Sequence, residues 1–476
     1  MSLEQLCHAT IVEVAPLLEQ KKISPVELTQ AMLGRIDKYD SVLHSYITPT
    51  ADNALAQARQ AEAEIQKGEY RGPLHGVPLA LKDLLYTRDA RTTCASAVLK
   101  NWGPDYNATA VDKLYQAGAI SLGKLSMTEF AQGGYHPDIP PPKNPWNPNH
   151  WSGLSSSGSA VAAAASLCFG ALGTDTGGSI RYPAAACGVV GLKPTYGRVS
   201  RYGAFPLAES LDHIGPMTRS VADAAILLEA IAGYDPMDPT SLKAPVPHYS
   251  DKLKDHLAGV RVGVDERYCS ENVAPEVAAA VMTAIDTLVE LGAKVVPLNL
   301  YELIEICDYW YPVTAAEAAA AHSAFYPTQA DSYGPTFRAL LEWGHTCSAL
   351  DITRSIAAKT KAGQVLENAY AKVDVIACPT MAMPAPPVEA FPPDMVAPPE
   401  AIPPLLHFTA PFNFTGHPTL SLPCGFAGDL PLSLQLIGDH CGESEILQVG
   451  YAYEQATEWH KQRPALLTEQ VPSGAC

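Results

Sequence analysis

The stretch from Ser152 to Ser179 constrains the fold of this chain more than any other part of it. It reads SGLSSSGSAVAAAASLCFGALGTDTGGS, so two runs of small residues enclose a charge-free, Ala-rich segment. Glycine permits unusual backbone conformations and lets a ligand approach backbone N–H groups. We therefore expect two loops, joined by a short apolar helix, that present hydroxyls and bare N–H groups to one point. This arrangement suits a developing negative charge beside a nucleophile, whereas flexible linkers rarely enclose a buried helix.

The composition argues against several classes of protein. The chain has 476 residues and a formal net charge of −18, which disfavours a nucleic-acid or anionic-membrane surface. Its first residues, MSLEQLCHATIVEVAPLLEQKK, do not resemble a secretory signal, and its longest apolar runs are too short to span a membrane. We expect a cytoplasmic protein that needs no cofactor.

The 11 cysteines are scattered, odd in number and without a Cys-x-x-Cys pair. This pattern favours reduced thiols. Cys168, Cys187 and Cys378 lie in apolar surroundings, so we predict that they are core residues. His and Cys do not recur at metal-binding spacing, and no metal centre is expected.

Apolar periodicity and turn signals predict alternating helices and strands. Ser24-Pro25 is typical of a helix start, with serine as the cap and proline in the first turn. The strands at 260–264 and 294–296 flank a helix, which indicates a parallel β-α-β unit. The ten prolines of 378–406 exclude regular structure there and predict a lid or a surface excursion. The predicted helices are 9–20, 25–37, 53–67, 108–117, 219–232, 275–291 and 444–459, and the other predicted strands are 119–124, 373–377, 419–423, 432–437 and the one that ends at Lys82.

Lys82 ends the apolar run that begins at Leu79. A lysine is rarely buried without a partner or a function. Burial lowers the pKa of a lysine from about 10.4 and yields a neutral amine that can act as a base. The residue alone leaves open the alternative, a lysine that extends to solvent from the strand end.

Several familiar catalytic motifs do not fit. The run 153–158 has the glycine spacing of a P-loop but lacks the lysine that must follow, and it lacks the final glycine of a hydrolase elbow. Residues 121–124 (SLGK) match Ser-x-x-Lys, but they lie in a predicted strand and no Lys-Thr-Gly follows. A Ser-His-Asp triad stays open, because none of the 14 histidines lies in a recognisable motif.

The remaining option is a serine activated by a lysine, and here the sequence is similar to a known family. Lys82, the Ser/Gly run up to Ser159 and the run 173–181 (GTDTGGSIR) resemble the amidase signature family. Ser155 precedes Ser179 by 24 positions and follows Lys82 by 73, and both intervals are typical of that family. Further resembling runs are 24–28 (SPVEL), 188–195 (GVVGLKPT) and 412–418 (FNFTGHP).

The resemblance implies an α/β fold with a large mixed, twisted central sheet that is flanked by helices on both faces. It implies a single domain over 1–476 with a catalytic core at about 74–219. The substrate pocket is then expected from three variable segments, 127–140, 301–345 and 378–410. Aromatic residues in these segments hint at an apolar or aromatic acyl group.

The resemblance also implies the roles of the site residues. Lys82 becomes the base, Ser155 the middle serine that shuttles the proton, and Ser179 the nucleophile. The backbone N–H groups of Thr176, Gly177, Gly178 and Ser179 become the oxyanion hole, and supporting roles fall on Asp175, Arg181 and Ser156.

The chain departs from the family pattern in its first loop. The family usually has Gly-Gly-Ser-Ser-Gly-Gly, and this chain has GLSSSG at 153–158. In the family the peptide bond before the middle serine is cis, which here implies a cis bond between Leu154 and Ser155. A cis bond that does not involve proline costs about 3–4 kcal/mol. Ser157 replaces a glycine, so the choice of Ser155 among three serines depends on spacing.

Two functions follow from the resemblance. The first is a stand-alone amidohydrolase acting on a small-molecule aryl or acyl amide, carbamate or urea, with no nucleic-acid or membrane partner and with a homodimer left open. The second is the glutamine-hydrolysing subunit of a tRNA-dependent amidotransferase. Members of the second kind usually carry Gln where Tyr182 stands, and the run 412–418 is more similar to stand-alone enzymes, so we favour the first. An inactive scaffold conflicts with the presence of all three catalytic residue types.

Overall fold

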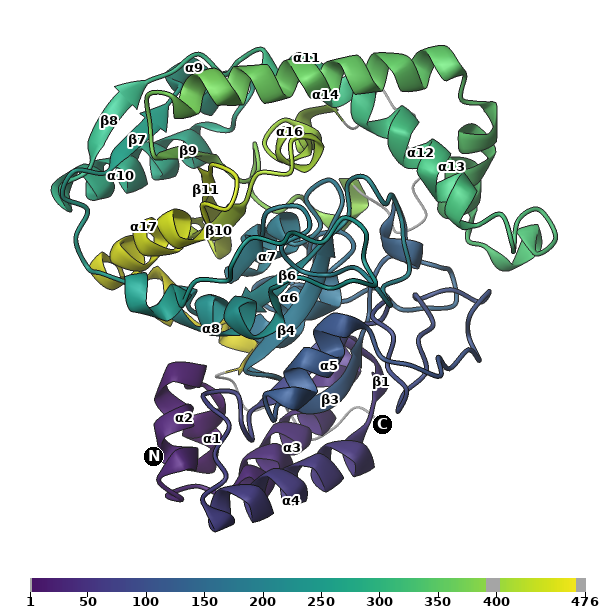
Figure 1. Cartoon of the computed structure of the whole chain (residues 1–476), viewed down its shortest axis with the longest axis vertical. Helices are drawn as coiled ribbons and strands as arrows, with labels where there is room; N and C mark the ends of the chain where they lie inside the picture. Colours follow the sequence, from purple (N-terminus) through teal and green to yellow (C-terminus); the bar gives the residue numbers. More distant parts are fainter. Residues whose placement is uncertain (1, 391–402, 468–476) are drawn as a thin grey trace.

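The computed structural model describes residues 2–390 and 403–467. Its centre is a mixed sheet of 11 strands, in the order β1-β3-β2-β4-β6-β5-β10-β11-β9-β7-β8. The pairs β3–β2, β2–β4, β9–β7 and β7–β8 are parallel, and the other neighbours are antiparallel. The expected α/β fold with a large mixed sheet is confirmed, and Figure 1 shows helices arranged around this sheet.

The elements follow one another along the chain in a mixed order of strands and helices. The strands are β1 (Tyr46–Pro49), β2 (Pro78–Lys82), β3 (Ile120–Leu125), β4 (Gly170–Asp175), β5 (Val190–Lys193), β6 (His213–Thr218), β7 (Arg261–Val264), β8 (Lys294–Pro297), β9 (Val375–Pro379), β10 (Thr419–Ala427) and β11 (Leu430–Gly438). The α-helices are α1 (Leu3–Cys7), α2 (Ile11–Glu19), α3 (Pro25–Leu43), α4 (Ala51–Lys67), α5 (Thr109–Gln116), α6 (Ser157–Ala164), α7 (Arg181–Cys187), α8 (Val221–Ile231), α9 (Glu266–Ser270), α10 (Pro275–Glu290), α11 (Leu303–Ile306), α12 (Trp310–Ala321), α13 (Pro335–Thr346), α14 (Ala349–Tyr370), α15 (Pro403–Leu406), α16 (Ala410–Phe414) and α17 (Glu443–Ala456).

Helices pack against both faces of strand β4, and its glycines show how closely. A Cβ at Gly170 would meet Leu227 of α8 at 2.7 Å, whereas a Cβ at Gly173 would meet Ser156, beside α6, at 2.9 Å. Because the two glycines are three residues apart in a strand, their Cα–H bonds point to opposite faces. Glycine therefore allows α6 and α8 to approach the same strand from opposite sides.

Several predicted elements are confirmed in detail. Ser24 caps α3 and its hydroxyl accepts hydrogen bonds from the N–H groups of Val26 and Glu27. Helix α3 continues to Leu43, beyond the predicted end at residue 37. Strands β7 and β8 pair in parallel around α10, as the β-α-β pattern predicts. The predicted core residues Cys168, Cys187 and Cys378 are fully buried, and residues 121–124 lie in strand β3, as predicted.

The second loop of the opening stretch begins later than the sequence predicts. Gly173, Thr174 and Asp175 were expected to lie in a loop, but they form the end of β4. This strand is buried along its whole length and lacks polar alternation, so the usual signal of a half-buried strand is missing. The loop itself starts at Thr176, directly after the last residue of the strand.

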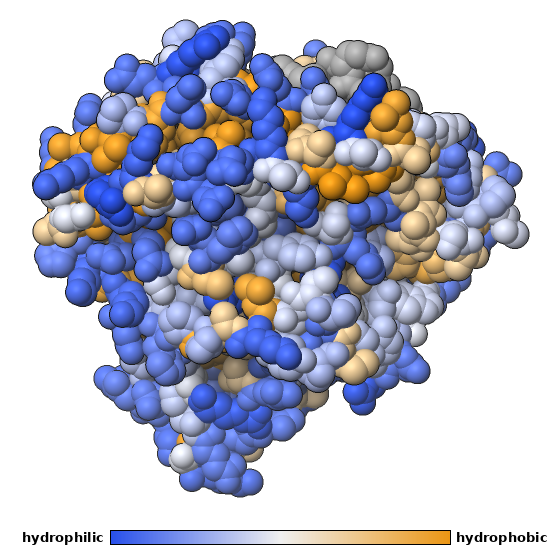
Figure 2. Space-filling view, turned by 45° about the horizontal axis from the view of Figure 1, so that its top comes forward, coloured by the Kyte–Doolittle hydropathy of each residue, from blue (hydrophilic) through white to orange (hydrophobic). Residues whose placement is uncertain are grey.

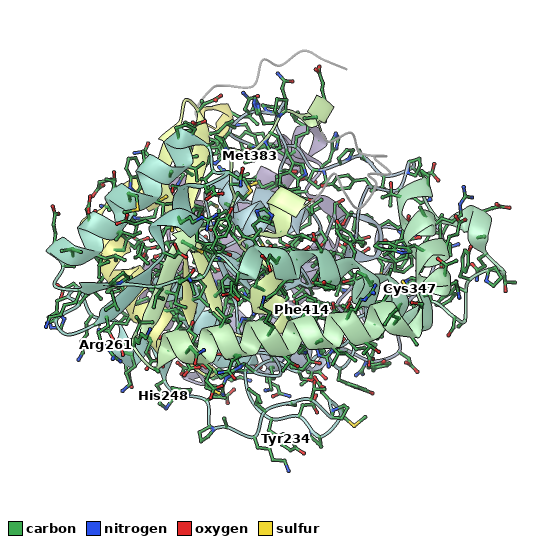
Figure 3. The ribbon with its side chains drawn as sticks, turned by 90° about the horizontal axis from the view of Figure 1, so that it is seen from above. Tyr234, His248, Arg261, Cys347, Met383 and Phe414 are labelled. Atoms are coloured by element: carbon green, nitrogen blue, oxygen red, sulfur yellow. The ribbon has the colours of Figure 1, made fainter. Side chains whose placement is uncertain are left out.

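The segment between β8 and β9 is mostly helical, which its aromatic composition did not predict. Helices α12 and α13 pack against each other, and the long α14 packs against α12 and α16. In Figure 3, α14 crosses the molecule in front of Phe414 of α16. The predicted proline-rich lid lies partly outside the described residues, namely at 391–402. The prediction that 378–406 lacks regular structure is wrong at both ends, because β9 continues to Pro379 and α15 spans Pro403–Leu406. Proline is compatible with the first turn of a helix, which is where Pro403 and Pro404 lie.

The exposed surface is mainly hydrophilic on the face seen in Figure 2. Apolar side chains gather mainly in the upper part of this face. Among the described residues, none of the helices combines the length and the apolar character that a membrane span requires.

The fit of α6 against its neighbours yields a stability prediction. A Cβ at Gly158 would lie 2.3 Å from the Ser126 carbonyl oxygen and 2.6 Å from that of Ser45. We expect Gly158→Ala to lower stability by about 3 kcal/mol through overpacking, a fall in Tm of about 5 °C. The matched control is Gly34→Ala in α3, where a Cβ meets nothing within 4 Å, and which is expected to leave the Tm unchanged or slightly raised. The Tm of both variants is measured by thermal unfolding. An equal Tm for the two variants would contradict the packing described for α6.

Candidate active site

The predicted catalytic residues come together at one end of the sheet. Lys82 ends β2, which pairs in parallel with β4. Ser155 and Ser156 precede α6, and Ser179 lies between β4 and α7. The residues of both loops are brought together because β2 and β4 are neighbours and α6 packs on both strands.

The Lys82 side chain is fully buried among hydroxyl groups. Its Nζ lies 2.8 Å from Ser155 Oγ, 2.9 Å from Ser156 Oγ and 2.8 Å from Thr174 Oγ1. Burial lowers the pKa of Lys82 to about 7, although the negative charges of Asp175 and Asp212 act in the opposite direction. The alternative of a lysine extending to solvent is therefore wrong.

The hydrogen bonds of Ser155 and Ser156 distinguish the two serines. Ser156 Oγ donates to the Thr174 carbonyl oxygen at 3.1 Å and accepts from the Thr174 N–H at 3.2 Å. Ser155 Oγ has a hydrogen bond with Lys82 alone among the described residues. A neutral amine has two protons and one lone pair, so one neighbouring hydroxyl must donate to it. The proton of Ser156 is already engaged, which leaves Ser155 and Thr174 to supply that proton.

The peptide bond between Leu154 and Ser155 is not cis. Tyr326–Pro327 is the only cis peptide bond among the described residues. The expectation taken from the family pattern is therefore wrong at this position. The bulky Leu154 stands where the family usually has glycine, and a cis bond without proline is unfavourable. The backbone turns instead at Gly153, whose φ is +94°. One of the Cα hydrogens of Gly153 points at Pro183.

Ser179 and the loop before it have free hydrogen-bonding groups. Ser179 is 8% exposed, and its hydroxyl has no hydrogen-bond partner among the described residues. The N–H of Gly178 donates to Asp175 Oδ1 at 2.8 Å, so this predicted oxyanion donor is already engaged. The N–H groups of Thr176, Gly177 and Ser179 are not engaged in this way and remain for a ligand oxygen.

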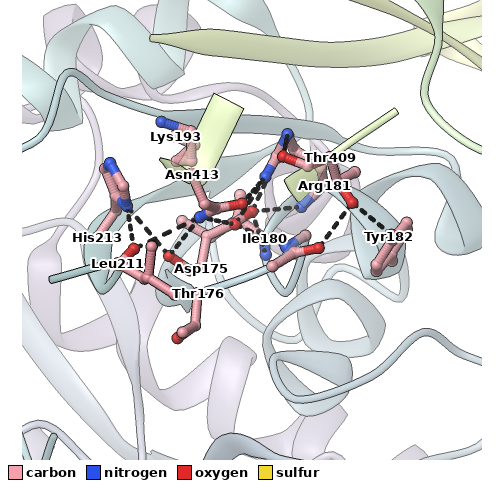
Figure 4. A network of polar contacts seen from close by, with 12 residues as sticks. Asp175, Thr176, Ile180, Arg181, Tyr182, Lys193, Leu211, His213, Thr409 and Asn413 are labelled. Carbon is pink, nitrogen blue, oxygen red and sulfur yellow. Dashed lines mark hydrogen bonds and ion pairs between the residues drawn. The ribbon is translucent and has the colours of Figure 1, made fainter. Parts of the chain in front are cut away.

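A buried ion pair holds the loop in place (Figure 4). The Arg181 guanidinium donates to both oxygens of Asp175, at 2.9 and 3.0 Å, and both side chains are fully buried. The Asn413 amide donates to Asp175 Oδ1 at 2.9 Å. Burial alone would raise the pKa of Asp175, but Arg181 and its other partners hold it well below its usual range. Asp175 and Arg181 thus fix the backbone that follows β4.

Two aromatic side chains cover the loop between Asp175 and Ser179. A Cβ at Gly177 would lie 2.5 Å from the Trp310 ring, and one at Gly178 would lie 2.3 Å from the Tyr182 ring. Trp310 Nε1 donates to the Thr176 carbonyl oxygen at 2.9 Å. The Tyr182 hydroxyl bonds to the Leu405 carbonyl oxygen and to Thr409. Glycine is required at both positions because the two rings lie directly against the backbone and leave no room for a Cβ.

Apolar groups lie beside the first loop. Leu154, which directly precedes the middle serine, packs against a buried cluster that includes Trp151, Tyr182, Met381 and Leu405. Met381 and Leu405 belong to the variable segment 378–410. This segment therefore contributes an apolar wall near the serines.

The variable segments 127–140 and 301–345 meet in an aromatic cluster. Phe130 and the next residue, Ala131, both have positive φ, +45° and +67°. The Phe130 ring lies 4.3 Å from the ring of His322 and 5.2 Å from that of Phe337. The aromatic residues of 301–345 thus include core residues that pack around the turn at Phe130.

Sequence reasoning missed Thr174 and Asn413 as site residues. Thr174 belonged to a predicted loop, and only the pairing of β4 with β2 brings its hydroxyl to the amine of Lys82. Asn413 lies within the resembling run 412–418, which was the one available signal. Among the residues that the structure describes, no group of three or more His, Cys, Asp or Glu could hold a metal ion.

Comparisons with known proteins show which family this chain is similar to. The family model described as Amidase matches residues 27–447. The putative amidase AmiD of Mycobacterium tuberculosis is 41% identical over 456 residues, 95% of each chain. A glutamyl-tRNA(Gln) amidotransferase subunit of Moorella thermoacetica is 41% identical over 492 residues, 97% of this chain and 99% of the relative. The crystal structure of a bacterial aryl acylamidase superposes with a TM-score of 0.87 at 25% identity and covers 97% of this chain and 99% of its own.

These matches span nearly the whole chain and include the segments that carry the buried lysine and both loops. The putative amidase and the amidotransferase subunit have the same sequence identity to this chain, 41%. The chain therefore belongs to the amidase signature family and is an amide-hydrolysing enzyme.

Proposed function

We propose that this enzyme hydrolyses small-molecule amides through a Lys82–Ser155–Ser179 relay and works without partner subunits. The proposal is supported above all by the buried Lys82 amine, which has no ion-pair partner among the described residues and is surrounded by hydroxyl groups. With a pKa of about 7, a substantial fraction of this amine is neutral at neutral pH. A neutral amine can accept a proton, which an exposed lysine cannot do under these conditions.

The first half of the reaction forms an acyl-enzyme. Lys82 accepts the proton of Ser155, Ser155 accepts that of Ser179, and Ser179 Oγ bonds to the substrate carbonyl carbon. The N–H groups of Thr176, Gly177 and Ser179 stabilise the oxyanion, with an effect of about 3–4 kcal/mol per donor. Ser155 then gives a proton to the amine nitrogen as the C–N bond breaks and the carbonyl re-forms, and Lys82 returns its proton to Ser155, which restores the neutral amine.

The second half releases the acid. Water donates a proton into the same relay and bonds to the acyl carbon, and the bond to Ser179 Oγ breaks as that oxygen regains its proton. The structure contains no hydrogen bond between Ser155 and Ser179. We propose that substrate binding brings the two hydroxyls into contact, because catalytic hydrogen bonds often tighten only in the complex.

The surroundings of Ser179 favour an apolar or aryl amide as the substrate. Trp310 and Tyr182 press on the loop before the nucleophile, and Leu154 joins an apolar cluster beside the first loop. Arg181 and Asp175 satisfy each other, so neither is free to bind a charged substrate. An uncharged substrate with an apolar acyl or amine group suits these surroundings.

Tyr182 supports a stand-alone enzyme over an amidotransferase component. In amidotransferase subunits we expect Gln at this position. The Tyr182 hydroxyl instead bonds to Leu405 and Thr409, so its side chain ties α7 to the segment around α15 and α16. The amidotransferase relative is as similar as the putative amidase, and overall identity does not separate the two functions.

Serine substitutions test the assigned roles. We expect Ser179→Ala to lower kcat/KM by at least about 10⁴-fold, since the nucleophile is lost. Ser155→Ala is expected to cost about 10³-fold through loss of the shuttle. Ser156→Ala removes one acceptor of Lys82 and is expected to cost only about 10-fold. Steady-state hydrolysis of a chromogenic anilide measures all three, and a larger loss for Ser156→Ala than for Ser155→Ala reverses the assignment of the shuttle.

The pH dependence of activity tests the role of Lys82. Only the neutral amine acts as the base, and the pKa of Lys82 is about 7. We therefore expect kcat/KM to be constant above this pH and to fall about 10-fold for each pH unit below it. Lys82→Arg carries a permanent charge and is expected to be inactive at every pH. A flat profile between pH 5 and pH 9 would exclude Lys82 as the base.

A substrate screen separates the two candidate functions. We expect turnover of anilides and apolar amides by the isolated chain, and glutaminase activity at least about 100-fold lower. The measurement is repeated with the other subunits of a tRNA-dependent amidotransferase. Strong glutaminase activity that appears only in that complex would favour the second function.

A further inference from the structure

A small cavity connects the surroundings of Lys82 with a second carboxylate. The cavity has a volume of about 230 Å³, and Thr174, Thr176 and Asp212 are among the residues that line it. Thr174 bonds to the Lys82 amine. Thr176, two residues later, donates its hydroxyl proton to Asp212 Oδ1. Lys82 and Asp212 are therefore each in contact with a threonine that faces the same cavity.

Asp212 is held by neutral groups. Its Oδ2 accepts hydrogen bonds from the N–H groups of Leu207 and Ala208, at 2.9 and 3.1 Å, and its Oδ1 accepts from Thr176. Among the ion pairs of the described residues, none includes Asp212. The cation that influences its pKa, Arg201, pairs with Asp238 at 3.7 Å. The carboxylate of Asp212 thus carries a negative charge that no side chain in contact neutralises.

The other ionisable groups that act on Lys82 differ from Asp212. The charge of Asp175 is balanced by Arg181, which contacts both of its oxygens. Burial raises the pKa of the Cys94 thiol well above its usual value, so this group is uncharged at neutral pH. Asp212 is left as the uncompensated negative charge near the amine.

We propose that Asp212 is a positioning residue whose negative charge, acting on Lys82 across the cavity, tunes the base of the reaction. The inference rests on the proposed function, because it assigns a role toward Lys82 as the base. A negative charge favours the ammonium form of Lys82 and so opposes the effect of burial. Burial raises the pKa of Asp212 itself to about 6, so it is mostly ionised at the pH at which Lys82 titrates.

The consequence is a defined shift in the pH dependence of catalysis. Replacing Asp212 by Asn removes the charge while keeping the shape and an oxygen that can accept from Leu207 and Ala208. The pKa of Lys82 is then expected to fall. The acid limb of the pH profile is the range in which the rate falls as the pH is lowered. Its midpoint is therefore expected to move to lower pH, by about 1 pH unit for an interaction of this kind. A role of Asp212 in folding alone would lower the amount of active enzyme without moving the limb.

The test uses a small alkyl fluorophosphonate, because its reaction with the nucleophilic serine can be measured without knowing the substrate. The Ser179 oxygen bonds to phosphorus, fluoride leaves, and the serine proton passes to the relay. The second-order rate constant of labelling is measured by intact mass between pH 5 and pH 9. Wild type is expected to show an acid limb near pH 7, and Asp212→Asn a limb about 1 pH unit lower.

Two further variants make the outcome specific. Asp212→Glu keeps the charge and is expected to restore the limb to near pH 7. Asp238→Asn removes a carboxylate that lines the same cavity but is paired with Arg201, and it is expected to leave the limb in place. An unchanged limb in Asp212→Asn, with wild type titrating near pH 7, overturns this inference. Failure of wild type to label Ser179, or absence of its limb, overturns the proposed function instead.

Discussion

The buried amine of Lys82 is the group on which the rest of the site depends. A lysine without an ion-pair partner is unfavourable in a protein interior unless hydroxyl groups or a lost proton compensate for the missing water. Here three hydroxyls from two elements surround it, two of them serines and the third Thr174. The same burial that is costly for stability brings the pKa into the range where the amine can act as a base. The proposed role of Lys82 as the base therefore depends on the position of this one side chain.

The sheet and its helices explain how this position is maintained. Strands β2 and β4 are neighbours, and helix α6 packs on both. Gly173 of β4 allows Ser156 to approach this strand, and Gly158 allows α6 to approach the backbone of Ser126 and Ser45. The ion pair of Asp175 and Arg181 then fixes the loop that ends at Ser179. Tyr182 and Trp310 hold that loop from outside. Lys82, Ser155 and Ser179 thus come from three segments that backbone packing aligns, and Lys82 also bonds directly to Ser155.

Much of this site could be predicted from the sequence, and the reason is spacing. Lys82, Ser155 and Ser179 stand at intervals that are typical of the family, and the glycines at 177 and 178 indicate close approach to the backbone. Helices α3, α4, α10 and α17 and the β7-α10-β8 unit also followed from periodicity, whereas the longest helix, α14, did not. Strand β4 did not, because a strand buried on both faces shows no alternation of polar and apolar residues. The roles of Thr174 and Asp212 depend on which strands become neighbours, and local sequence patterns do not contain that information.

In the proposed mechanism Ser179, activated through Ser155 and Lys82, forms the covalent acyl intermediate. The most direct test is to quench the enzyme with acid during turnover of an anilide that carries an aromatic acyl group, and to map the modified peptide by mass spectrometry. We predict the acyl mass on Ser179 in wild type and no adduct in Lys82→Ala over the same time. An adduct on Ser155, Ser156 or Ser157, or equal acylation without Lys82, would contradict this mechanism.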